Sequence, residues 1–83
     1  MDDTPRNQPD APRRMKISQA ARQAGVSKQT VEYYVMLGLV EPIREGEKRR
    51  RFFTDEHVRR IRLIRQLNQT GYTLRAIKET YLK

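Results

Sequence analysis

Residues 17–36 read ISQAARQAGVSKQTVEYYVM, and the order of small, apolar and polar residues in this stretch decides the fold. Two helices that cross closely need a small residue at the crossing, which Ala21 provides. They also need a residue that tolerates positive φ four positions later, which Gly25 provides. Apolar residues that can lock the helices together stand at Ala20, Ala24, Val26, Val31 and Tyr34. With no charged residue at any of these positions, the pattern predicts a helix-turn-helix.

Capping residues set the expected bounds of the two helices. Ser18 is expected to cap the first helix, which Gly25 ends. Ser27 is expected to cap the second, which runs over residues 27–37 and meets a left-handed cap at Gly38. The second helix is the expected recognition helix.

Beyond this unit, residues 42–53 read PIREGEKRRRFF, with a turn residue at Gly46 and aromatic residues at the end. This pattern predicts a short hairpin, the wing, over residues 43–53. Thr54 and Thr73 are expected to cap a third and a fourth helix, each with an apolar stripe. The expected fold class is mainly α: a winged helix-turn-helix of four helices with a short two-stranded β-hairpin wing.

The chain is expected to divide into a tail and a single domain. Residues 1–14 contain three prolines among polar residues and little apolar surface, so they are expected to form a disordered tail. Residues 15–83 are expected to form the domain. The tail has three arginines and three aspartates, so the net charge of +8 lies entirely on residues 15–83. A compact domain with this excess attracts polyanions, although a solvated basic surface would have the same composition.

Composition argues against several classes of function. With 83 residues and no cysteine, the chain offers neither a thiolate metal site nor room for a deep catalytic cleft. His57 has no second histidine to pair with, and no nucleophile–base pair or phosphate loop is present. We therefore expect no enzyme, no metal and no cofactor. No apolar run approaches the ~20 residues of a membrane span, so we expect no membrane partner and a cytoplasmic, nucleoid-associated protein.

The outward residues of the recognition helix carry groups that suit duplex DNA in the major groove. Gln29 can pair with adenine and Lys28 can reach guanine, while the hydroxyls of Ser27, Thr30 and Tyr33 can contact phosphates. Glu32 repels phosphate, so it is expected to face a cytosine amino group, a nearby arginine or water.

Basic residues outside this helix are expected to hold the DNA backbone. The wing contains an unbroken basic run, Lys48, Arg49, Arg50 and Arg51, suited to phosphates or the minor groove. A solvated edge that blocks strand pairing is the alternative reading of this run. Arg59 and Arg62 are neighbours on the third helix and could extend the phosphate contacts, with a solvated helix face as the alternative reading.

Over residues 15–82 the sequence resembles the MerR-type winged helix-turn-helix family. The residues that match the pattern of this family are Val26-Ser27, Thr30, Tyr33-Tyr34, Gly38-Leu39-Val40, Arg51, Phe53 and Gly71-Tyr72-Thr73. The resemblance implies that Tyr33, Arg51 and the start of the recognition helix contact DNA, and that the protein regulates transcription. Glu32 and Val35 depart from the family's usual Arg and Glu.

Typical members of that family continue into a dimerisation helix and an effector domain. We therefore expect a small stand-alone member with no small-molecule effector domain. Its partners would be double-stranded DNA and either further copies along the DNA or a partner regulator. Two alternatives remain: an excisionase-like architectural factor that bends DNA, and a protein-interaction adaptor of the chaperone-modulator type, which Glu32 would permit.

Overall fold

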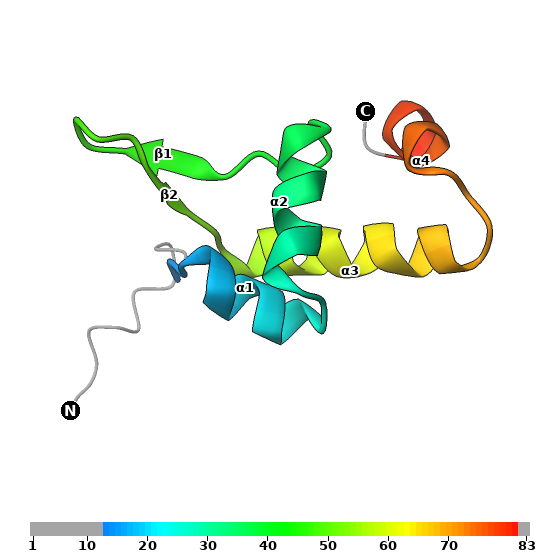
Figure 1. The fold of residues 1–83 in the computed structure, drawn as a ribbon, viewed down its shortest axis with the longest axis horizontal. Helices are drawn as coiled ribbons and strands as arrows, with labels where there is room; N and C mark the ends of the chain where they lie inside the picture. Colours follow the sequence, from blue (N-terminus) through cyan, green and yellow to red (C-terminus); the bar gives the residue numbers. More distant parts are fainter. Residues whose placement is uncertain (1–12, 82–83) are drawn as a thin grey trace.

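The computed structural model describes residues 13–81 (Figure 1). In chain order its elements are α1 (Ile17–Ala24), α2 (Lys28–Met36), β1 (Ile43–Glu45), β2 (Arg50–Phe52), α3 (Asp55–Gln69) and α4 (Leu74–Tyr81). This order confirms the predicted mainly helical fold with a two-stranded wing. The tail was predicted over residues 1–14, and its residues 1–12 lie outside the described residues.

The turn between α1 and α2 has the geometry that its sequence predicts. Gly25 adopts a left-handed φ of 74° and its N–H donates to the carbonyl of Arg22. Ser27 caps α2, because its Oγ accepts the N–H of Thr30 at 3.0 Å. Local hydrogen bonds therefore close the turn of the helix-turn-helix. The turn contains a glycine, whose lack of a Cβ permits the positive φ.

The start of α1 differs from the prediction that Ser18 caps it. The N-cap is Lys16, and its side chain makes no capping hydrogen bond. Met15 pairs with Phe53 in an antiparallel bridge, with N–H to O distances of 2.7 and 2.8 Å. Because this bridge holds the chain extended as far as Met15, the helix begins at Ile17 and Ser18 falls inside it.

The wing is a short antiparallel ribbon in which Ile43 pairs with Phe52 and Glu45 with Arg50. Gly46 opens the turn with a φ of 80°, as predicted, and its carbonyl accepts the N–H of Arg49 at 3.1 Å. Arg49 also has a positive φ, of 55°, which is uncommon for a residue with a Cβ.

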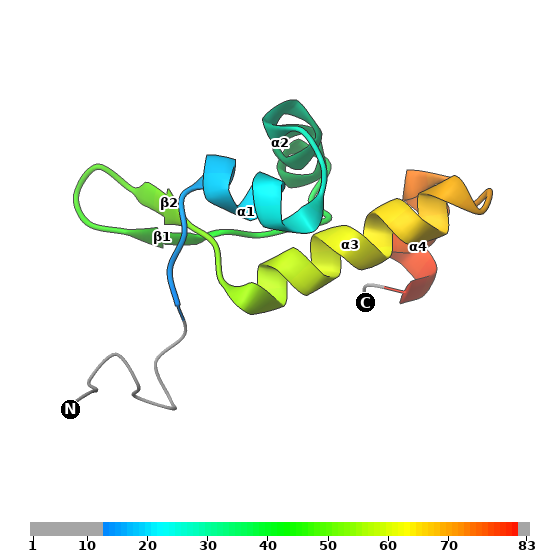
Figure 2. The same ribbon diagram turned by 90° about the horizontal axis from the view of Figure 1, so that it is seen from below.

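The core lies where α1 packs against both α2 and α3, and where α4 packs against α3. Figures 1 and 2 show the wing and α4 at opposite ends of α3, with α1 and α2 beside it. The largest fully buried side chains are Phe53, Met15, Leu39, Ile61, Ile64, Ile77, Val31 and Val40. Phe53 lies at the junction of β2 and α3, so the wing is anchored directly to the core.

Thr54 and His57 join the wing to the start of α3. The N–H of Thr54 donates to His57 Nδ1 at 2.9 Å, which confirms Thr54 as the cap residue. With Nδ1 accepting, the neutral imidazole carries its hydrogen on Nε2, which donates to the carbonyl of Glu41 at 2.8 Å. His57 is half-buried, and these two hydrogen bonds give it a structural role.

Candidate nucleic-acid interface

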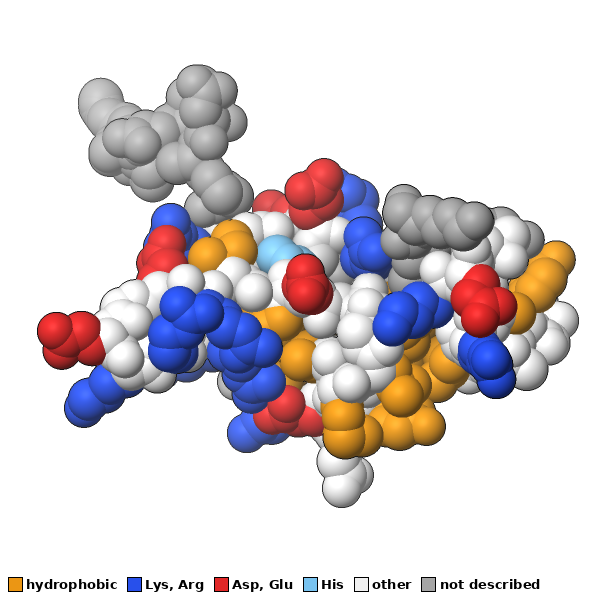
Figure 3. Space-filling model, turned by 90° about the horizontal axis from the view of Figure 1, so that it is seen from above, with side chains coloured by type: hydrophobic (Ala, Val, Ile, Leu, Met, Phe, Trp, Pro, Cys, Tyr) orange, Lys and Arg blue, Asp and Glu red, His pale blue; other side chains and the backbone are white. Residues whose placement is uncertain are grey.

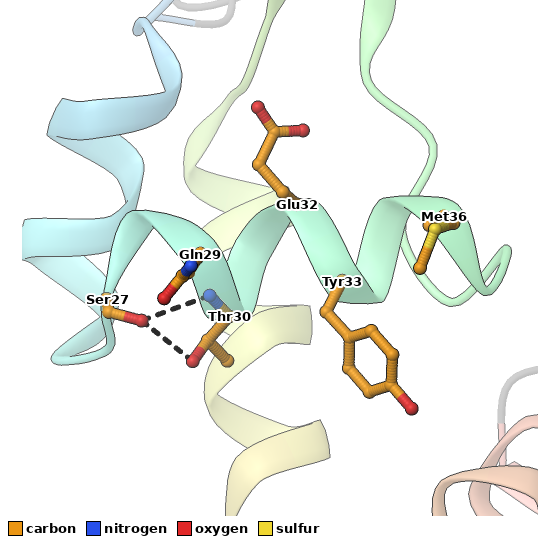
Figure 4. Close-up of a pocket in the computed structure, with 6 residues that line it drawn as sticks. All are labelled: Ser27, Gln29, Thr30, Glu32, Tyr33 and Met36. Atoms are coloured by element: carbon orange, nitrogen blue, oxygen red, sulfur yellow. Dashed lines mark hydrogen bonds between the residues drawn. The ribbon is translucent and has the colours of Figure 1, made fainter.

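One face of α2 is open to solvent and polar at its start. Lys28 and Gln29 are exposed, and Tyr33 is 48% exposed. A shallow hollow along this face is lined by Ser27, Gln29, Thr30, Glu32, Tyr33 and Met36 (Figure 4). In this view Glu32 and Tyr33 leave the helix on opposite sides. The structure therefore places Gln29, one of the two predicted base-reading residues, in this hollow, while Lys28 is exposed but does not line it.

The hydroxyls of Ser27 and Thr30 at the start of this face are coupled. Their oxygens lie 2.9 Å apart, so one hydroxyl donates to the other. Ser27 also accepts the N–H of Thr30. One hydroxyl hydrogen of the pair is left over, and it can donate to a phosphate oxygen.

The wing presents a run of exposed cations. Lys48 and Arg49 lie in the turn and Arg50 opens β2, and all three are exposed. In Figure 3, lysine and arginine side chains gather over the end of the molecule that the wing forms. Such a protruding basic ribbon suits the DNA backbone, which carries one negative charge per ~1.7 Å of duplex axis.

Arg51 is the member of the basic run that turns toward α2. Its Nη1 and Nη2 donate to Glu32 Oε1 and Oε2 at 2.9 and 2.8 Å, in a bidentate pair. The hydrogen bond from Arg51 lowers the pKa of Glu32, and the same bond raises the pKa of Arg51. Of the three surroundings expected for Glu32, the structure shows a nearby arginine.

Arg13 and Arg14, which the sequence placed in the tail, lie against the folded domain. Arg14 pairs with Glu45 of β1 and lies over the ring of Phe52, with 5.9 Å from its Cζ to the ring centroid. Arg13 pairs with Asp55 at 3.3 Å. The base of the wing thus has a second set of cations beside it.

The two predicted arginines of α3 have different surroundings. Arg62 Nη2 donates to the carbonyl of Gln23 at 2.6 Å, near the C-terminus of α1. Arg59 lies about one turn earlier on α3 and is exposed. The structure therefore gives Arg62 a contact within the fold in addition to the phosphate contact that the sequence predicts.

Arg65 is a further candidate that the predicted set of DNA contacts does not include. It lines a hollow where the end of α3 faces the start of α2, together with Gly25, Ser27, Thr30, Asn68 and Gln69. Its position three residues after Arg62 was the available signal, because residues three apart share a helix face. The contact with the start of α2 depends on how the helices pack, which this spacing does not give.

An exposed recognition helix beside a basic hairpin defines the class of protein as a winged helix-turn-helix. Residues 15–82 match the family described as MerR HTH family regulatory protein, and the chain belongs to this family.

Several curated regulators are similar to the chain. It is 32% identical over 65 residues to the heavy metal-dependent transcription regulator 2 of Rhizobium meliloti (strain 1021), covering 78% of this chain and 44% of the relative. It is 33% identical over 64 residues to the mercuric resistance operon regulatory protein of Bacillus cereus, covering 77% and 48%. The chain thus spans less than half the length of these curated relatives.

Solved structures show the same fold. HiNmlR, a MerR family regulator that lacks the sensor domain and was crystallised with promoter DNA, superposes with a TM-score of 0.71 at 30% identity. The match covers 81% of this chain and 51% of HiNmlR. A MerR family regulator from Bacillus cereus superposes with a TM-score of 0.73 at 22% identity, covering 86% and 53%. The family match and the likeness to HiNmlR do not favour the architectural and adaptor alternatives, and the likeness to the Bacillus cereus regulator, at 22% identity, shows the fold alone.

Proposed function

We propose that this protein is a sequence-specific regulator of transcription that binds double-stranded DNA. Its recognition helix, α2, would enter the major groove, and its wing would hold the phosphate backbone or the minor groove. Lys28 and Gln29 would read base edges, while Ser27, Thr30 and Tyr33 would contact phosphates.

The observation that carries this proposal is the placement of the exposed face of α2 next to the basic wing. Lys48, Arg49 and Arg50 are exposed, and no contact of theirs within the described residues competes with a phosphate. Arg51 joins the wing to α2. Arg59, Arg62 and Arg65 would extend the backbone contacts along α3.

We infer that the protein acts by binding and carries out no catalysis, as do the transcription regulators to which it is similar. Within residues 13–81, no group of acidic residues and histidine is arranged to hold a metal ion. None of the helices in the described part is both long and apolar enough to cross a bilayer. We propose the cytoplasm, on the nucleoid, as its place of action, because its proposed ligand is genomic DNA.

The proposal is tested by fluorescence anisotropy with a random duplex at low salt, followed by selection of bound duplexes from a random pool. If about five to eight phosphates are neutralised, log K should fall with log salt with a slope of about −0.9 per contact. The selected pool should contain a consensus sequence, whose half-site spacing and orientation report how copies are arranged.

Charge reversal in the wing provides the matched comparison. Arg50→Glu should weaken duplex binding and make its salt dependence shallower. Arg75→Glu should have a small effect, because Arg75 is an exposed arginine of α4 that already pairs with Glu79. Duplex affinity that is insensitive both to salt and to Arg50→Glu would refute the proposed function.

A further inference from the structure

The bidentate pair between Glu32 and Arg51 joins the two parts of the candidate interface. Glu32 stands on the open face of α2, in the same hollow as Gln29 and Tyr33 (Figure 4). Arg51 lies in the middle of β2, and its side chain is 30% exposed against 43% for Glu32. Solvent, and any ligand on this surface, can therefore reach both partners.

A carboxylate and a phosphate compete for the same donors of arginine. The planar guanidinium group binds either anion through two parallel N–H bonds, so one bidentate partner excludes the other from that edge. Glu32 occupies the two terminal nitrogens of Arg51 at 2.9 and 2.8 Å. Within the described residues, Arg51 is the member of the basic run that has such a carboxylate partner.

We propose that Glu32 determines specificity by holding Arg51 away from the phosphates of non-cognate DNA. The carboxylate occupies the donors that would otherwise bind a phosphate. One wing arginine therefore no longer contributes to sequence-independent binding of the DNA backbone. Discrimination is then left to a larger extent to Lys28 and Gln29 at the start of α2. This inference rests on the proposed DNA-binding function and adds to it a residue that limits non-specific affinity.

The expected size of the effect follows from counting phosphate contacts. Releasing Arg51 adds one contact, which makes the slope of log K against log salt steeper by about 0.9. At ~0.1 M salt, one additional contact raises affinity for random duplex by up to about tenfold. The ratio of cognate to random affinity should fall, because the added contact is blind to sequence.

The test measures binding of the full chain to a random duplex and to the selected duplex over a range of salt concentrations. Glu32→Gln should bind the random duplex more tightly and with the steeper slope. Glu47→Gln is the matched control, because it removes the same charge from the exposed wing turn while releasing no arginine. Its slope should equal that of the wild type.

A double-mutant cycle assigns the effect to Arg51. In an Arg51→Gln background, Glu32→Gln should no longer change the slope. A Glu32→Gln slope equal to that of Glu47→Gln, or a change that persists without Arg51, would overturn the inference while leaving the proposed function intact. Failure of the wild type to bind any duplex at low salt would overturn both. Thermal unfolding of each variant confirms that the comparison is between folded proteins.

Discussion

Glu32 shows how a single residue can change which neighbouring cations are available to bind DNA. The family pattern places an arginine at this position, where it would add to the positive surface. The carboxylate instead binds Arg51, a residue 19 positions away, and removes one cation from the set that is free to meet DNA. The interface therefore has fewer available charges than a count of lysines and arginines suggests.

Acid should weaken this pair. The pKa of Glu32 lies below its ordinary value of 4.5 because Arg51 donates hydrogen bonds to the ionised form. A depressed folded pKa gives a contribution to stability that is fully present above the unfolded pKa and is lost as pH falls through the folded one. The difference in unfolding free energy between wild type and Glu32→Gln should therefore hold near neutral pH and shrink below pH 4.5.

Urea unfolding at a series of pH values measures this difference. Glu47→Gln is the control, since no cation partner of Glu47 lies in the described part of the chain. A difference for Glu32→Gln that stays constant through the acid range would mean that the ion pair contributes nothing to the folded state.

At the scale of elements, α3 and α4 support the helix-turn-helix through its helix ends. Arg62 donates to a carbonyl at the end of α1, and Lys78 Nζ donates to the carbonyl of Leu37 at the end of α2, at 3.0 Å. The last carbonyls of a helix carry partial negative charge and lack partners within the helix. Both cations therefore fasten the supporting helices to the recognition unit.

Arg62→Ala should lower the free energy of unfolding by about 1 kcal/mol, since a cation near a helix C-terminus contributes roughly 0.3–1 kcal/mol and the hydrogen bond adds to it. Arg59→Ala, on the same helix, should cost less than about 0.5 kcal/mol, as is usual for exposed sites. Chemical denaturation of the two variants measures both values. Equal effects would show that the contact with Gln23 does not stabilise α1.

Signals that act within a few residues predicted most of the elements. The turn at Gly25, the cap at Ser27 and the cap at Thr54 depend on backbone geometry close to each residue, and the structure confirms them. The cap at Ser18 was wrong because a partner from another element, Phe53, set where the extended chain ends.

The arrangement of the site depended on contacts that span long stretches of chain. The pair between Glu32 and Arg51 needs the hairpin to fold back onto α2, and the bond from Arg62 to Gln23 needs α1 packed on α3. Sequence could supply Arg51 as a wing residue and a nearby arginine as one option for Glu32. The sequence alone could not show that Arg51 is the partner of Glu32, because the distance between the two side chains is a property of the folded molecule.

At the scale of the whole molecule, Phe53 is a residue whose contacts join several separate segments. Its side chain is fully buried, its backbone pairs with Met15 at the start of the domain, and its ring meets His57 edge to face at 5.7 Å. One residue thus connects the N-terminal segment, the wing and α3. The neighbouring Phe52 is only half-buried.

Phe53→Ala should cost about 3–5 kcal/mol, the usual range for a buried phenylalanine. This is a large share of the ~5–15 kcal/mol that stabilises a typical domain, so the melting temperature should fall by more than ~10 °C. Phe52→Ala should have a clearly smaller effect. Calorimetry of both variants measures the two melting temperatures. Equal decreases would contradict the larger contribution of Phe53 to stability.

The bridge between Met15 and Phe53 also has a consequence for the order of events during synthesis. A ribosome releases α1 and α2 first, before Phe53, the residue that pairs with Met15, has emerged. The bridge can form only after Phe53 emerges, and the core that supports the recognition unit is complete only after Ile61 and Ile64 follow. Because small domains usually fold as one cooperative unit, nascent chains that stop before the wing is complete should not bind DNA.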